Sequence, residues 1–182
     1  MTRQYPDEPA GPFPEPPQTI TDGEGRTIHL RGVDGPAPTP PGVDRDLRDA
    51  LVGMYLAFDP ADRAQGVPPT GEDRIRRWLD TLLEGYDVVA WHEDRVVGHA
   101  TLVPDDEGGC ELAIFVVRSH QNAGVGTELL RTLLGHGAAR GVDRVWLTVE
   151  RWNRAAVALY ERVGFETVSA ENFDLEMAIR LA

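Results

Sequence analysis

Two glycines lie two positions apart in the segment HQNAGVGTEL, residues 120–129, immediately before an apolar run that favours a helix. Glycine has no Cβ, so Gly124 and Gly126 can take left-handed dihedrals and can let another group approach the main chain. The first amide hydrogens of a helix lack internal partners, and the helix dipole favours negative charge at that end. The segment therefore predicts a phosphate-binding turn.

Two common phosphate motifs do not fit this segment. The dinucleotide fingerprint needs a third glycine at the position of Leu129. The P-loop needs a lysine after its second glycine, and all 18 basic residues of this chain are arginine. Rossmann-type dinucleotide binding and P-loop nucleotide hydrolysis are therefore excluded.

Glu111 is a candidate general base, because it opens the strand-like segment ELAIFVV, residues 111–117. A carboxylate at the mouth of a buried strand loses part of its hydration, which raises its pKa toward the range where it accepts a proton from an ammonium group, directly or through water. A solvated acid at a strand end explains the same residue equally well. The residue pattern alone leaves both interpretations open.

The turn and the acid need a scaffold, and hydrophobic periodicity predicts one. Strand patterns occupy residues 26–33, 88–92, 95–103, 110–117, 143–150 and 172–181, and helical spacing occupies residues 43–58, 71–85, 125–138 and 153–163. Hairpins mixed with a crossover helix favour one α/β (α+β) domain with a mixed, mostly antiparallel sheet. We expect about six to seven strands flanked by about four helices.

The beginning of the chain has a different composition. Residues 1–25 are rich in proline, glycine and acid, and their few apolar side chains cannot bury enough surface to offset the cost of ordering. We expect a flexible, disordered tail there and a folded domain over residues 26–182.

Two blocks of sequence resemble one known family. Gln121, Gly124 and Gly126, placed between a strand and a helix, resemble motif A of the GNAT (Gcn5-related N-acetyltransferase) superfamily, which reads Gln or Arg, two residues, Gly, one residue, then Gly or Ala. Residues 142–166, VDRVWLTVERWNRAAVALYERVGFE, resemble its motif B, a strand, an asparagine, a helix bearing a tyrosine, and a glycine-phenylalanine ending. The resemblance covers residues 26–182. It implies a GNAT-like domain that moves an acetyl group from acetyl-CoA directly to a primary amine of a small-molecule or peptide acceptor.

The resemblance also implies which residues bind coenzyme A. Backbone amides would hold its pyrophosphate, with Gln121 shaping a turn made of Asn122, Ala123, Gly124, Val125, Gly126 and Thr127. The open edge of a strand would pair with the pantetheine amides through the backbone of Phe115, Val116 and Val117, and the Val117 amide would reach the thioester carbonyl. Asn153 would contact the pantetheine arm and also cap its own helix.

Tyr160 is the candidate general acid toward the coenzyme A sulfur, again by resemblance. A phenol with a pKa near 10 facing a thiol with a pKa near 8.5 is a reasonable donor to a nascent thiolate. Packing in the core beside Val157 and Val163 is the alternative for this side chain. The resemblance supports Glu111 as the base as well. The alternative function is a non-catalytic acyl-CoA binding or sensing domain.

Other reactive side chains give weaker signals. The five histidines lack the spacing of metal ligands, so no metal is expected. Ser119 and His120 are adjacent, and adjacent side chains rarely face each other as nucleophile and base. Cys110 reads as a small buried apolar residue, and as a lone cysteine it has no internal disulfide partner.

Composition limits the partners. The formal net charge is -12, which disfavours nucleic acid, and no run is long enough to cross a membrane. With one cysteine and no signal peptide, we expect a cytoplasmic protein. Acidity without lysine suggests adaptation to high salt or a GC-rich genome. A homodimer is compatible with the sequence.

Overall fold

The computed structural model describes residues 2–64 and 66–182. Over these residues one eight-stranded sheet has the order β1-β2-β3-β4-β5-β6-β8-β7. The β5–β6 pair is parallel and the other neighbouring pairs are antiparallel. The strands are β1 (Gln18–Thr21), β2 (Thr27–Gly32), β3 (Tyr86–His92), β4 (Arg95–Pro104), β5 (Cys110–Val116), β6 (Arg144–Glu150), β7 (Glu166–Glu171) and β8 (Asp174–Arg180).

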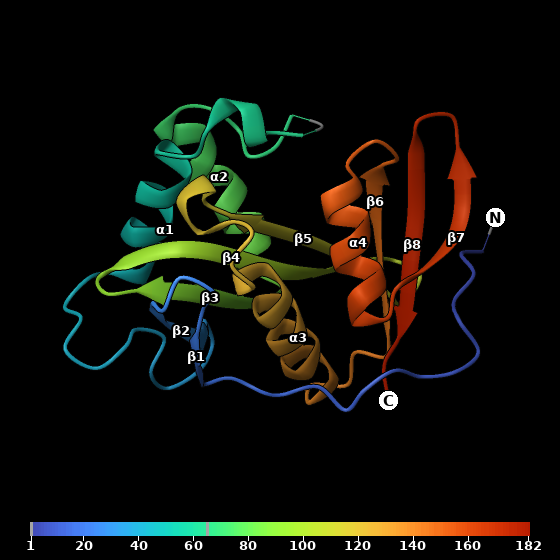
Figure 1. The fold of residues 1–182 in the computed structure, drawn as a ribbon, viewed down its shortest axis with the longest axis horizontal. Helices are drawn as coiled ribbons and strands as arrows, with labels where there is room; N and C mark the ends of the chain where they lie inside the picture. The colour runs from blue at the N-terminus through green and yellow to red at the C-terminus, as the bar shows by residue number, and fades with distance from the viewer. Residues whose placement is uncertain (1, 65) are drawn as a thin grey trace.

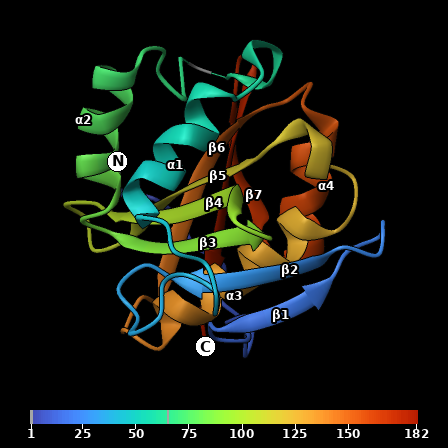
Figure 2. The same cartoon turned by 90° about the vertical axis from the view of Figure 1, so that its left-hand side faces the viewer.

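In the part of the chain that the structure describes, four α-helices flank the sheet: α1 (Leu47–Leu56), α2 (Glu72–Leu82), α3 (Val125–Ala138) and α4 (Arg154–Val163). Helices α1 and α2 cover one face, and α3 and α4 cover the other (Figures 1 and 2). Each face has its own buried core, with Leu129 and Leu133 of α3 in one and Leu51 and Leu79 of α1 and α2 in the other. In the described residues no helix combines the length and apolar character needed to cross a bilayer.

The α/β fold with a mixed, mostly antiparallel sheet is confirmed, and the sheet is slightly larger than expected. The two additional strands are the short β1 and the polar β7. Both are the outermost strands of the sheet, where one face and one edge stay in solvent. Edge strands need few apolar side chains, so periodicity gives little signal there.

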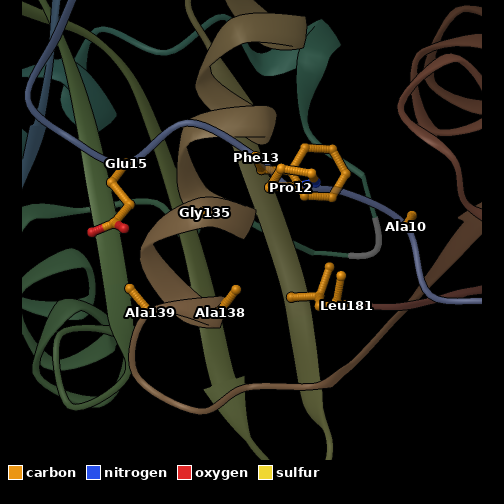
Figure 3. A pocket seen from close by; sticks show the side chains of 9 residues that line it. Ala10, Pro12, Phe13, Glu15, Gly135, Ala138, Ala139 and Leu181 are labelled. Carbon is orange, nitrogen blue, oxygen red and sulfur yellow. The ribbon is translucent and has the colours of Figure 1, made fainter.

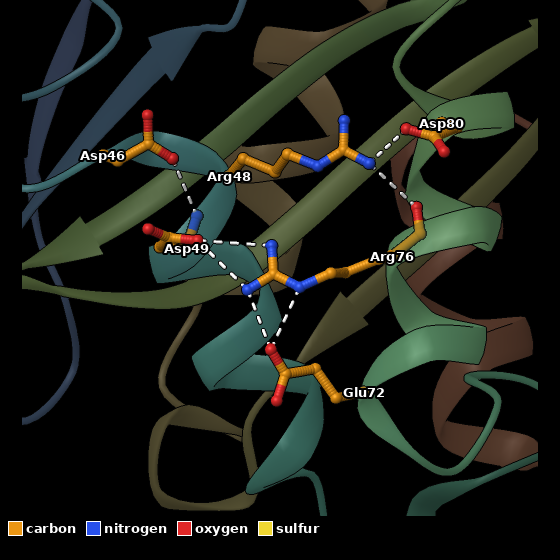
Figure 4. Close-up of polar contacts among 6 residues, drawn as sticks. All are labelled: Asp46, Arg48, Asp49, Glu72, Arg76 and Asp80. Carbon is orange, nitrogen blue, oxygen red and sulfur yellow. Dashed lines mark hydrogen bonds and ion pairs between the residues drawn. The ribbon is translucent and has the colours of Figure 1, made fainter.

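Helices α1 and α2 are joined by ion pairs across their exposed sides (Figure 4). Arg76 of α2 lies 3.2 Å from Asp49 of α1 and 2.9 Å from Glu72 in its own helix. Arg48 of α1 pairs with Asp80 of α2. Exposed pairs of this kind contribute about 0–1 kcal/mol each, so buried apolar contacts carry most of the packing between these helices.

The N-terminal segment differs from the expected flexible tail, because it lies along the folded domain. Its residues 18–21 form strand β1, and Ala10 pairs with Leu181 beyond β8. Between these points the chain passes over helix α3 at Gly135 (Figure 3). A Cβ on Gly135 would stand 2.0 Å from the carbonyl oxygen of Pro14, so a glycine in the helix makes this approach possible.

Candidate functional site

Strands β5 and β6 separate soon after they meet. They pair at Cys110 with Val145 and at Glu111 with Trp146, and then diverge (Figure 1). Beyond Glu111 no strand of the described residues pairs with the edge of β5 that faces β6. Apart from the Val116 carbonyl, which accepts from Gln121, the backbone groups on this edge are available to a ligand.

Strand register decides which backbone groups lie on that edge. The Val117 amide donates to the Val97 carbonyl at 3.0 Å, so the odd-numbered residues of β5 direct their backbone groups toward β4. The structure therefore corrects the roles expected of Phe115 and Val117. The alternation of the strand places the backbone groups of Leu112, Ile114 and Val116 on the open edge.

The glycine turn follows β5 and ends in the N-terminus of α3. Gly124 has φ +85° and Asn122 has φ +57°, both in the left-handed region that glycine and asparagine tolerate best. The first backbone hydrogen bond of α3 runs from the Glu128 amide to the Gly124 carbonyl. Among the described residues no side chain caps α3, whereas Asp46 caps α1 and Asn153 caps α4.

The uncapped end leaves the amides of Val125, Gly126 and Thr127 without intrahelical acceptors. The side chain of Val125 is fully buried, which anchors the turn while its backbone faces outward. A Cβ on Gly126 would be 3.7 Å from Leu159 of α4 and 3.8 Å from Val116 of β5, so α3 begins between these two elements. Free amides at a helix N-terminus are suited to bind an anion, and these lie near the open edge of β5.

The N-terminal hairpin braces the turn from outside. Gly23, between β1 and β2, donates its amide to the Ala123 carbonyl at 2.8 Å. Arg26 donates to the Ser119 carbonyl at 2.8 Å and pairs with Asp22 at 2.7 Å. The hairpin thus holds the turn through Asp22, Gly23 and Arg26, which lie within or next to the segment expected to be a flexible tail.

A second brace joins the turn to the loop between α1 and α2. Gln121 Nε2 donates to the Val116 carbonyl at 3.0 Å and to Asp62 at 3.2 Å. Arg118 pairs with Asp59 at 2.8 Å and with Asp62 at 2.9 Å. One residue of this loop, Gln65, lies outside the described residues.

Tyr160 lies on α4 and packs against the core on the α3–α4 face. Its ring centroid is 5.7 Å from that of Phe165, and burial raises the pKa of its hydroxyl to about 12. At neutral pH the hydroxyl therefore keeps its proton and can only donate it or share it. Asn153 begins the same helix and accepts a hydrogen bond from the Ala156 amide at 3.3 Å, as its residue type predicted.

Glu111 lies at the point where β5 and β6 part, with one side open to solvent. Partial burial raises its pKa, the positive charge of Arg3 lowers it, and the negative charge of Asp105 raises it, with a net rise. Because the residue is exposed although its pKa is raised, both interpretations of this acid stay open. Neighbouring Cys110 is buried, and burial raises the pKa of its thiol to about 11, which keeps it protonated and unreactive.

Arg162 gave no signal in the sequence, and Ser119 and His120 contact each other against expectation. Arg162 donates to the Thr127 hydroxyl at 3.2 Å, which brings a cation from α4 beside the N-terminus of α3. Ser119 and His120 do face each other, with Oγ and Nδ1 2.8 Å apart, and His120 continues to His92 at 3.0 Å. Among the described residues no group of three or more histidines, cysteines and acids has the geometry of a metal site.

An aromatic wall stands beside β5 on the α1–α2 face. Phe115 lies 5.4 Å from Trp78 and 5.5 Å from Tyr55 between ring centroids. Behind it the Tyr55 hydroxyl donates to His99 at 2.6 Å, and His99 donates to Asp87 at 2.6 Å. These two buried hydrogen bonds link α1 to β4 and β3. Separating them would leave polar groups buried without a partner, which costs free energy.

Comparison with known proteins identifies the family. Residues 46–165 match the model of the Acetyltransferase (GNAT) family. This chain belongs to that family. The mycothiol acetyltransferase of Salinispora tropica is 31% identical over 171 residues, which cover 90% of this chain and 51% of that protein. The chain thus spans about half the length of the curated relatives it matches.

Solved structures show the same fold at low sequence identity. The GNAT domain of S. lividans PAT has a TM-score of 0.70 at 16% identity, covering 90% of this chain and 96% of that one. The protein yncA of Salmonella typhimurium, solved with its cofactor acetyl-CoA, has a TM-score of 0.64 at 18% identity, covering 85% and 94%. The GNAT-like fold is therefore confirmed.

Proposed function

We propose that this chain transfers an acetyl group from acetyl-CoA to a primary amine. The observation that carries the proposal is the uncapped N-terminus of α3, which opens beside the unpaired edge of β5. Amides at a helix N-terminus suit the two charges of a pyrophosphate, and an open strand edge suits the amide groups of pantetheine.

Each part of the cofactor then meets a specific part of the chain. The amides of Val125, Gly126 and Thr127 take the pyrophosphate, with Arg162 adding positive charge at Thr127. The edge residues Ile114 and Val116 pair with pantetheine in place of Phe115 and Val117. Asn153, at the start of α4, serves chiefly as a helix cap.

Glu111 and Tyr160 supply the proton transfers. Glu111 takes a proton from the acceptor ammonium, and the neutral amine nitrogen attacks the thioester carbonyl. As the new C–N bond forms and the C–S bond breaks, the Tyr160 hydroxyl donates its hydrogen to the departing sulfur. The second amine proton passes to solvent and solvent returns a proton to Tyr160, so the products are an amide and a free thiol and the hydroxyl is restored.

The pKa of Tyr160 changes how this residue acts. A phenol with a pKa near 12 loses its proton reluctantly to a thiolate whose ordinary pKa is about 8.5. Burial also raises the pKa of a thiol, which reduces the gap. A strong hydrogen bond to the sulfur in the transition state is therefore the main contribution of Tyr160, with full proton transfer following as the thiol leaves.

The alternative is a domain that binds acyl-CoA without reacting. A Tyr160→Phe variant separates the two functions, since it keeps the ring that packs on Phe165 and removes the donor. The enzyme should lose about 10²-fold in kcat and bind acetyl-CoA as before. Tyr86→Phe, on β3, is the matched control and should behave like the wild type.

The deciding experiment is calorimetric titration with acetyl-CoA, followed by thiol release with a panel of primary amines. Gly126→Asp should raise the Kd by at least about tenfold, because it adds negative charge at the anion site. Gly126→Ala should bind like the wild type, since its methyl group would make ordinary contacts. Equal affinity for acetyl-CoA in the wild type, Gly126→Asp and Gly126→Ala would refute the anion site. Binding of acetyl-CoA without release of the thiol in the presence of any amine would favour a non-catalytic acyl-CoA binding domain.

A further inference from the structure

Arg3 lies on the part of the sheet where β5, β6 and β8 meet, on the α1–α2 face beyond the helices. Its guanidinium carbon is 3.4 Å from the ring centroid of Trp146 on β6. Its Nε is 3.0 Å from Glu176 on β8, and its Nη1 is 3.4 Å from Asp105. The side chains of Arg3 and Asp105 are each 18% exposed and that of Glu176 is 28% exposed, so this cation is largely removed from water.

The groups around Arg3 are held by the sheet and its turns. The Trp146 indole donates to Asp105 Oδ2 at 2.8 Å, which fixes the ring. The other oxygen of Asp105 accepts from the amides of Gly109 at 2.8 Å and Glu107 at 2.9 Å. The Trp146 face and the fixed Asp105 carboxylate, with Glu176 beside them, make a site suited to a cation.

This cation site lies next to the candidate base. Trp146 stands directly opposite Glu111 at the last position where β5 and β6 pair. Arg3 is close enough for its charge to oppose the rise in the pKa of Glu111. A positive group bound on Trp146 is therefore beside the carboxylate that accepts a proton in the proposed reaction.

We propose that the cation site formed by Trp146, Asp105 and Glu176 binds the ammonium group of the acceptor, and that Arg3 occupies this site as an internal competitor. The inference rests on the proposed function. A guanidinium fits the same cation site but keeps its proton at any physiological pH, so Arg3 blocks the site without being acetylated. Release of the N-terminal segment then admits the acceptor.

The test uses the n-butylammonium ion as the probe and the indole signal of Trp146 in a ¹H–¹⁵N spectrum as the readout. The signal is assigned with a Trp146→Phe variant, and neutral n-butanol serves as the uncharged control. Arg3→Gln should lower the Kd of n-butylammonium by about fivefold or more, because a competitor that occupies the site reduces the apparent affinity by the free fraction. Arg3→Lys keeps the charge and should stay near the wild type.

Arg144→Gln is the matched control, because it removes another arginine that contacts the N-terminal segment but not the one that occupies the cation site. Arg144 lies on the same strand as Trp146, with its guanidinium 5.7 Å from the ring of Tyr5, so it also holds the N-terminal residues. It should leave the affinity for n-butylammonium unchanged. Equal affinity in the wild type and Arg3→Gln, an equal gain in Arg144→Gln, or an equal response to n-butanol would each overturn the proposal.

Titration of the same variants with acetyl-CoA keeps the two hypotheses apart. The wild type and the Arg3 and Arg144 variants should all bind acetyl-CoA with the same affinity, since the cation site is separate from the anion site. If the wild type does not bind acetyl-CoA, the proposed function is refuted. The Trp146 signal would still show in that case whether n-butylammonium displaces Arg3.

Discussion

Glu111 shows how one carboxylate combines a cost in stability with a role in chemistry. Partial burial raises its pKa, so the folded state favours the protonated form more than the unfolded state does. Above the pKa of the folded state the carboxylate is ionised and destabilises the fold. In that ionised form it can accept a proton, and turnover should fall as pH drops through this raised pKa.

Replacement of this acid should therefore separate activity from stability. Glu111→Gln should lower turnover by about 10²-fold at neutral pH, remove the acidic limb of the pH–kcat/KM profile, and raise the thermal midpoint. Thiol release at a series of pH values and a thermal scan check both outcomes. Glu107→Gln, in an exposed turn, should change neither, and an unchanged pH profile in Glu111→Gln would remove this residue from the mechanism.

Among the elements, helix α3 has two tasks at its two ends. Its N-terminus presents free amides to the site, and its C-terminal half accepts the N-terminal segment against Gly135. Gly137 in the same turn lies against Leu102, since a Cβ there would be 2.7 Å from the leucine side chain. Both glycines cost helix propensity, and close packing is the reason they are tolerated.

Replacement of a helical glycine by alanine should lower the free energy of unfolding at Gly135 in α3 and raise it at Gly53 in α1. Gly135→Ala should destabilise the protein by about 1–3 kcal/mol, because the methyl group would overlap Pro14. Gly53→Ala in α1 meets only an ordinary contact at 3.9 Å and should stabilise by about 0.5–1 kcal/mol. Urea unfolding measures both, and a gain in stability in Gly135→Ala would show that the segment does not press on α3.

For the whole molecule, the net charge of -12 opposes compaction through self-repulsion. Added salt should raise the thermal midpoint, since screening removes repulsion among many charges and weakens a few surface ion pairs worth about 0–1 kcal/mol each. Ordinary screening is largely complete near physiological ionic strength, where the Debye length is about 8 Å. A midpoint that keeps rising into molar sodium chloride would indicate high-salt adaptation, and an early plateau would argue against it.

The sequence by itself determined the four helices, the six inner strands and the glycine turn of the described residues, whereas the edge strands β1 and β7 gave little signal. Helical and strand periodicity, the two glycines and the Asn153 cap are local features, so short-range patterns predicted α3, α4 and the anion site between strand and helix. The predictions of α3, α4 and the Asn153 cap are confirmed, because backbone conformation and capping depend on residues a few positions apart. The anion site and the role of Glu111 stay predictions.

Tertiary structure decided everything that depends on residues far apart in the chain. The register of β5 against β4 directs the Val117 amide away from the open edge and leaves that edge to Val116. The N-terminal segment is ordered because Gly135 and Leu181, more than a hundred residues later, provide surfaces for it. Arg3 reaches Trp146 for the same reason, since pairing between distant segments leaves no periodic trace in the sequence.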